Sequence, residues 1–164
     1  MTLLCSVTAI FDRDLRALRR EVEAYPDEGG LWVRVPGITN VAGNLVLHLA
    51  GNLQYYIGTV LGHTGYVRDR PAEFGRRDVP RAELLREVEA ARMAVMNALE
   101  RPIDLEAEFP ESILGMRVRT GDYLIHLATH FAYHLGQLDY HRRVVTGDDK
   151  AVDAMRPTEL SSAQ

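Results

Sequence analysis

Apolar residues recur at spacings of three and four along four separate stretches of the chain, which is the pattern of amphipathic α-helices. Proline and glycine residues, such as Pro26 and the pair Gly29-Gly30, interrupt the pattern between them. The pattern predicts helices over about 2–24, 39–62, 80–100 and 120–147. Four helices with few strand signals predict an all-α protein, and a four-helix bundle is the natural architecture for them.

Two of the segments that connect the predicted helices have a distinctive composition. Residues 63–79 are rich in glycine, proline and charge, and we expect the basic stretch from Arg68 to Arg77 to be a solvated loop. Residues 101–119 alternate between apolar and polar in places, which predicts a short strand pair before the last helix. We therefore expect one bundle domain over 1–147, followed by a polar tail over 148–164 that is frayed or weakly docked.

Composition and charge exclude several classes of protein. With 19 basic and 23 acidic residues the net charge is −4, which argues against nucleic-acid binding. No stretch approaches the ~20 apolar residues of a membrane span, and the N-terminal stretch lacks the basic start of a signal peptide. We expect a cytoplasmic protein without a membrane partner. The single cysteine, Cys5, excludes an intrachain disulfide, and we expect it to be neither ligand nor nucleophile.

The last predicted helix carries four of the six histidines, at positions 126, 130, 134 and 141. The first three follow each other at intervals of four residues, so they climb one face of the helix. Residues four apart lie ~6 Å from each other and residues eight apart lie ~12 Å apart. Zinc–nitrogen bonds of ~2.0–2.1 Å cannot span the longer distance. Either His126 and His130 or His130 and His134 can therefore share one metal ion, and a third ligand has to come from another helix.

Three histidines could supply that third ligand: His48, His63 and His141. Only His48 is predicted near the middle of its helix, level with the middle of the last helix in either orientation. We therefore assign a metal site to His48, His130 and His134. The alternative is that these are ordinary core or surface histidines, because an H-x-x-x-H pattern alone is a weak signal. The sequence lacks both the H-E-x-x-H motif of zinc proteases and the paired E-x-x-H motifs of di-iron bundles.

Two segments also carry a family resemblance. LVLHLAGNL in the second helix and HFAYHLGQLDYHRR in the last helix, together with RDRPAEF at 68–74, resemble the DinB-like superfamily, close to a subgroup of uncharacterised bacterial proteins. The resemblance extends over nearly the whole chain. It implies a four-helix bundle, often a homodimer, with one divalent metal ion held by three histidines, which by motif are His48, His130 and His134. His126 matches a position that is often histidine in such proteins, and we expect it to support the ligands or lie in the core.

Three neutral imidazoles would leave a divalent ion with an open position, as in catalytic rather than structural metal sites. The resemblance implies an enzyme that activates a low-molecular-weight thiol, because characterised relatives include thiol S-transferases and a thiol-dependent isomerase. It favours zinc or nickel, with iron and manganese as alternatives. A metal-dependent hydrolase could use the same site with water as the nucleophile. A non-enzymatic, stress-related bundle that binds metal or a small molecule is the other alternative.

Polar and aromatic side chains near the three histidines are candidates for orienting the imidazoles. They lie on the two histidine-bearing helices: Asn52, Tyr56, Tyr133 and Gln137. The competing interpretation of each is a packing or capping residue. We also expect Gly136, two residues after His134, to allow another helix to approach closely.

Overall fold

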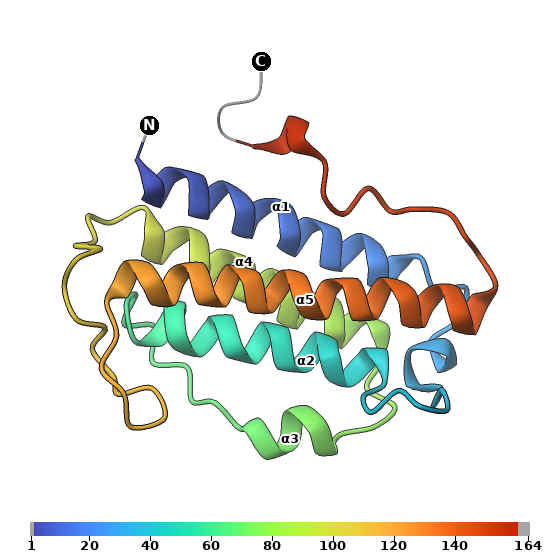
Figure 1. Cartoon of the computed structure of the whole chain (residues 1–164). Coiled ribbons are helices and arrows are strands. Elements are labelled where there is room, and N and C mark those ends of the chain that lie inside the picture. Colours follow the sequence, from blue (N-terminus) through green and yellow to red (C-terminus); the bar gives the residue numbers. More distant parts are fainter. Residues whose placement is uncertain (1, 161–164) are drawn as a thin grey trace.

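The computed structural model describes residues 2–160, and in that range the protein consists of five α-helices without a strand. Four of them are long and form the bundle, and one short helix covers its side (Figure 1). The predicted all-α four-helix bundle is confirmed. None of the helices in the described range is long and apolar enough to cross a membrane. The bounds are α1 Leu3–Glu23, α2 Ala42–Leu53, α3 Arg70–Gly75, α4 Arg81–Leu99 and α5 Thr120–Thr146.

The packing of the long helices brings α2 and α5 side by side. Helices α1 and α2 each pack against both α4 and α5. In Figure 1, α2 runs in the opposite direction to α5, so that the middle of one helix faces the middle of the other. Histidines placed in the middle of these two helices are therefore level with each other.

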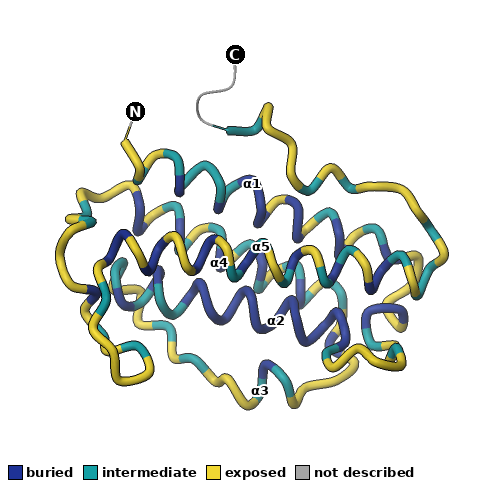
Figure 2. Tube along the Cα trace, viewed as in Figure 1, coloured by how far each residue is buried: buried dark blue, intermediate teal, exposed yellow. Residues whose placement is uncertain are grey.

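Helix α2 is buried along its whole length. Every residue from Ala42 to Leu53 is buried, as the continuous dark-blue trace in Figure 2 shows. Such a helix is covered on all sides, which agrees with its apolar sequence AGNLVLHLAGNL. It begins later than predicted, with Val41 rather than Thr39 or Asn40 at the N-cap. Beyond Leu53 the chain continues as a π-helical segment, Gln54–Thr59.

The outer side of α2 is covered by α3, which the sequence analysis did not predict. Asp69 caps α3 by accepting a hydrogen bond from the Ala72 N–H (3.0 Å), and a proline stands in its first turn. The helix packs against α2 and buries Glu73, which is only 5% exposed and pairs with Arg68. The prediction of a solvated loop is wrong for these two residues. Pairing the two charges offsets part of the cost of removing them from water.

The segment between α4 and α5 folds back on itself without forming the predicted strand pair. Within the described residues it has only two isolated bridges, Glu108 with Arg119 and Ile113 with Met116. Pro110 stands between them, and proline has no N–H to continue a ladder. The segment is nevertheless anchored, because the Phe109 N–H donates to the Val118 carbonyl (2.8 Å) and the Phe109 ring is buried.

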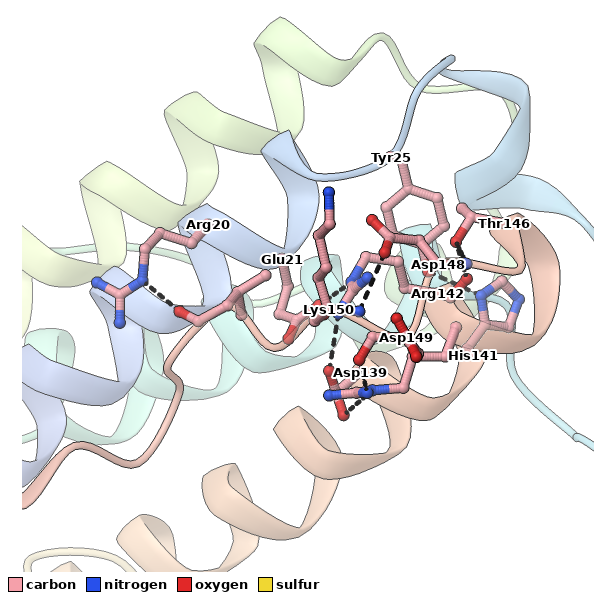
Figure 3. A network of polar contacts seen from close by, with 12 residues as sticks. Arg20, Glu21, Tyr25, Asp139, His141, Arg142, Thr146, Asp148, Asp149 and Lys150 are labelled. Atoms are coloured by element: carbon pink, nitrogen blue, oxygen red, sulfur yellow. Dashed lines mark hydrogen bonds and ion pairs between the residues drawn. The ribbon is translucent and has the colours of Figure 1, made fainter.

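The residues after α5 lie along α1 instead of fraying (Figures 1 and 3). Arg142, 1% exposed near the end of α5, donates to Glu21 Oε2 (2.6 Å) and to the Lys150 carbonyl (2.8 Å). Arg20 on α1 then donates to the Val152 carbonyl (2.9 Å). The sequence predicts a frayed or weakly docked tail because the tail is polar. The contacts that hold it, made by its backbone carbonyls and by Glu159, which pairs with Arg16 (3.0 Å), form no periodic pattern in the sequence. The division into a bundle domain and a tail stays a prediction.

Candidate metal centre

Three histidines converge between α2 and α5. His48 comes from α2, and His130 and His134 lie one turn apart on α5. Each offers one ring nitrogen, and the three nitrogens lie within 4.8 Å of one another. The Nε2 atoms of His48 and His130 are 3.3 Å apart. Two nitrogens bound tetrahedrally to one ion at ~2.1 Å would be ~3.4 Å apart, so the donor set fits a single divalent cation.

The other histidines lie outside this group. His126 is exposed, and its ring stacks on Tyr123 with 5.7 Å between centroids, 6.1 Å from the ring of His130. We expected His126 either to support the ligands or to lie in the core, and the second of these expectations is wrong. His63 is exposed after the π-helical segment. His141 is fully buried but pairs with Tyr25 (2.8 Å) and the Val33 carbonyl (2.9 Å).

A buried carboxylate orients His48. Glu73 Oε2 accepts a hydrogen bond from His48 Nδ1 (2.9 Å), which leaves the Nε2 lone pair facing the other two histidines. Arg68 donates to both carboxylate oxygens, at 2.7 and 2.9 Å, and its guanidinium lies over the ring of Tyr56. Burial alone would raise the pKa of Glu73, but the hydrogen bonds from His48 and Arg68 outweigh it and hold the pKa below its usual range. Glu73 therefore remains a carboxylate and a strong acceptor.

Gly51 makes room for this carboxylate on the surface of α2. A Cβ at Gly51 would lie 2.5 Å from Glu73 Oε1 and 3.1 Å from its Cδ, closer than such atoms pack. Sequence reasoning missed Glu73 and Arg68 as part of the site. A usable signal was present, because Asp69 followed by Arg70-Pro71 is an N-cap with proline in the first turn, which predicts a short helix.

His134 is oriented from within α5. Its Nδ1 donates to Gln137 Oε1 (2.7 Å), which leaves Nε2 free to face the site, as expected for Gln137. The exposed ring of Tyr133 lies edge-on to the His134 ring at 5.2 Å. Asn52 is buried, and its Oδ1 has no hydrogen-bond partner in the described part of the chain, so it does not orient a histidine. A Cβ at Gly136 would meet nothing within 4 Å, and the prediction of a close helix approach there is wrong.

Burial keeps His130 and His134, the two candidate ligands on α5, neutral. It lowers the pKa of His130 to about 4, helped by the neighbouring imidazoles of His134 and His48. Burial also lowers the pKa of His134, although the hydrogen bond to Gln137 opposes the effect. A neutral imidazole is the form that binds metal ions. The site therefore offers nitrogen donors with free lone pairs at neutral pH.

A cleft of about 390 Å³ opens beside His134. Its wall is formed by the loop before α2 and by one face of α5, including Thr39, Asn40, Tyr133 and Gln137. Three protein ligands would leave a metal ion with an open position, and His134 is the one of the three histidines that lines this cleft. The arrangement is suited to binding a substrate atom directly on the metal.

Comparisons with known proteins agree with this geometry. A family model described as mycothiol-S-transferase matches residues 6–147. A search of curated proteins and a search of solved structures each found no match. The matched region contains all three converging histidines as well as Arg68 and Glu73. The resemblance noted in the sequence is confirmed: the chain belongs to the mycothiol-S-transferase family, which is part of the DinB-like superfamily.

Proposed function

We propose that the protein is a metal-dependent thiol S-transferase whose thiol substrate is mycothiol, the thiol in the description of its family. The observation that carries this proposal is the convergence of three imidazoles on one point beside an open cleft. The donor set leaves at least one position on a divalent ion for a substrate sulfur. Zinc or nickel suits three imidazoles, with iron and manganese as alternatives.

The residues of the chain have separate tasks in this proposal. His48, His130 and His134 would hold the ion, which would lower the pKa of a bound thiol so that its sulfur reacts as a thiolate. Glu73 fixes the ring of His48, and Gln137 fixes the ring of His134. Both keep a nitrogen lone pair aimed into the site. Their task is to maintain the geometry of the donors rather than to exchange protons with the substrate.

The transfer requires no reactant other than the thiol and the electrophile. The thiol gives up its proton to solvent, and the sulfur electron pair forms a bond to an electrophilic carbon. The leaving group on that carbon departs with the electron pair of its bond. The products are a thioether, a proton and an anion.

Initial rates with purified, metal-loaded protein test the proposal. We expect a rate of thioether formation that requires both mycothiol and the metal, and that falls to background with a chelator or in His134→Ala. His63→Ala, which replaces an exposed histidine outside the site, should retain the rate. A metal-dependent rate with water alone would instead favour a hydrolase. No metal-dependent rate with any thiol or with water would favour the non-enzymatic bundle.

A further inference from the structure

A leucine stands at the tip of a tight hairpin where neither the backbone nor the solvent favours it. Ile113 and Met116 pair through two backbone hydrogen bonds of 2.9 Å, and the two residues between them have positive φ, 50° at Leu114 and 82° at Gly115. This is the pattern of a type I′ turn, in which asparagine or glycine is preferred at the position of Leu114. The Leu114 side chain is 94% exposed. Folding alone gives no reason for a leucine here, and such a residue is a candidate for function.

The hairpin forms one wall of an apolar cleft of about 260 Å³ against the first turns of α5. Asp122 is the single acidic residue in the lining, and Arg119 holds it at 3.0 Å. An uncharged, apolar molecule is therefore the occupant that this cleft would bind. Its volume lies below the ~300–1,000 Å³ typical of sites for drug-sized ligands, so the molecule is small. The lining residues are Ile113, Leu114, Met116, Val118, Asp122, Tyr123 and His126.

The position of this cleft relates it to the three histidines. Its lining includes the stacked pair Tyr123 and His126, and the ring of His126 lies 6.1 Å from that of His130. The larger cleft lies beside His134, two helical turns or ~12 Å farther along α5. The two clefts thus flank the candidate metal centre on either side along the same helix.

The two clefts differ in chemistry. The apolar cleft is lined by four aliphatic side chains of the hairpin segment. The cleft beside His134 carries uncharged polar groups that can donate and accept hydrogen bonds: the hydroxyls of Thr39, Tyr133 and Tyr140 and the amides of Asn40 and Gln137. A transferase that joins a polar thiol to an apolar partner needs two sites of this kind.

We propose that the apolar cleft between the 113–118 hairpin segment and α5 binds the electrophilic co-substrate, a small uncharged apolar molecule with a leaving group. The polar body of the thiol then lies in the cleft beside His134. This assignment rests on the proposed thiol transfer. The sulfur approaches the electrophilic carbon from the side of His134, and its electron pair forms the S–C bond. The leaving group departs with the electron pair of the bond that breaks. The proton of the thiol goes to solvent.

The substitution Leu114→Asn separates this role from a structural one. Asparagine adopts positive φ more readily than leucine, so the variant should fold at least as stably as the wild type. With metal-loaded protein and mycothiol, we expect the KM for the apolar electrophile 1-chloro-2,4-dinitrobenzene to rise at least tenfold. The KM for mycothiol should stay unchanged. Val67→Asn, at an exposed valine that lines neither cleft, is the matched control and should change neither constant.

An unchanged KM for the electrophile in Leu114→Asn, or a raised KM for mycothiol instead, would overturn the assignment. A binding measurement keeps it separate from the proposed function. In protein labelled with [¹³C-methyl]methionine, the unreactive analogue 2,4-dinitrotoluene should shift the signal of Met116 and leave that of Met155, which lies on the tail, in place. An unmoved Met116 signal refutes the cleft whatever the enzyme does. A shifted signal in a protein without thiol transfer supports an apolar ligand site and refutes its role in catalysis together with the proposed function.

Discussion

Replacing Gly51 with alanine should weaken metal binding while leaving the bundle folded. The new Cβ would lie 2.5 Å from Glu73 Oε1, whereas nonbonded heavy atoms pack at ~3.5 Å, so the carboxylate must retreat by ~1 Å. The hydrogen bond from His48 Nδ1 to Glu73 is 2.9 Å long, and a retreat of that size takes it beyond hydrogen-bonding distance. Losing such a partner of a metal-ligating histidine costs about 10–100-fold in affinity, which is ~1.4–2.7 kcal/mol.

A second helical glycine provides the control. Gly136 on α5 also becomes alanine without a change of backbone conformation, and its Cβ would meet nothing within 4 Å. Gly136→Ala should leave metal affinity unchanged and stabilise the helix by up to ~1 kcal/mol. The two substitutions are chemically identical, so a difference between them reports the contact with Glu73.

The assay is zinc affinity by competition with a chromophoric chelator, together with thermal unfolding of the metal-free proteins. We expect Gly51→Ala to bind zinc about 10–100-fold more weakly than both the wild type and Gly136→Ala. If Gly51→Ala instead bound zinc like the wild type and melted as high as Gly136→Ala, Glu73 would not be positioning His48.

Three further predictions concern the rest of the molecule. Arg142→Met should cost ~3–5 kcal/mol in urea unfolding at pH 8, because it leaves the Glu21 carboxylate buried without a partner, and adding Glu21→Leu should recover most of the loss. Burial raises the pKa of Glu21 from its ordinary value of 4.5 to about 7, although Arg142 opposes the shift. The protonated Glu21 carboxyl therefore contributes stability that is fully present below pH 4.5 and is lost as pH rises through 7. Between pH 5.5 and 8 the free energy of unfolding of the wild type should fall by ~2 kcal/mol relative to that of Glu21→Gln. The same dependence of unfolding free energy on pH in both proteins would contradict this. Light scattering tests the homodimer expected from the family resemblance, which requires twice the 18.4 kDa of one chain.

The part of the fold that follows from local periodicity was predictable from the sequence. The long helices have apolar stripes with a helical period, and the observed bounds of α1, α4 and α5 fall within a residue or two of the prediction. The convergence of His48 with His130 and His134 was also predictable, because helix geometry limits α5 to two ligands and His48 lies level with them. Neither the helix bounds nor the convergence of the histidines depends on how the loops fold.

The remainder depends on contacts that leave no periodic signal. Glu73 and Arg68 lie in a charged segment typical of solvated loops, and only the packing of α3 on α2 shows that Glu73 is buried and Arg68 half-buried. The tail docks through backbone carbonyls that accept from Arg20 and Arg142, and through the ion pair of Glu159 with Arg16. His126 is exposed, which its spacing to His130 does not specify.

The metal content of protein purified without a histidine tag tests the central claim most directly. We expect close to one divalent ion per chain in the wild type by elemental analysis. The double variant His48→Ala/His134→Ala should contain almost none, whereas His63→Ala/His126→Ala, which also removes two histidines, should match the wild type. If His48→Ala/His134→Ala kept the wild-type metal content, the assignment of the site to His48, His130 and His134 would be contradicted.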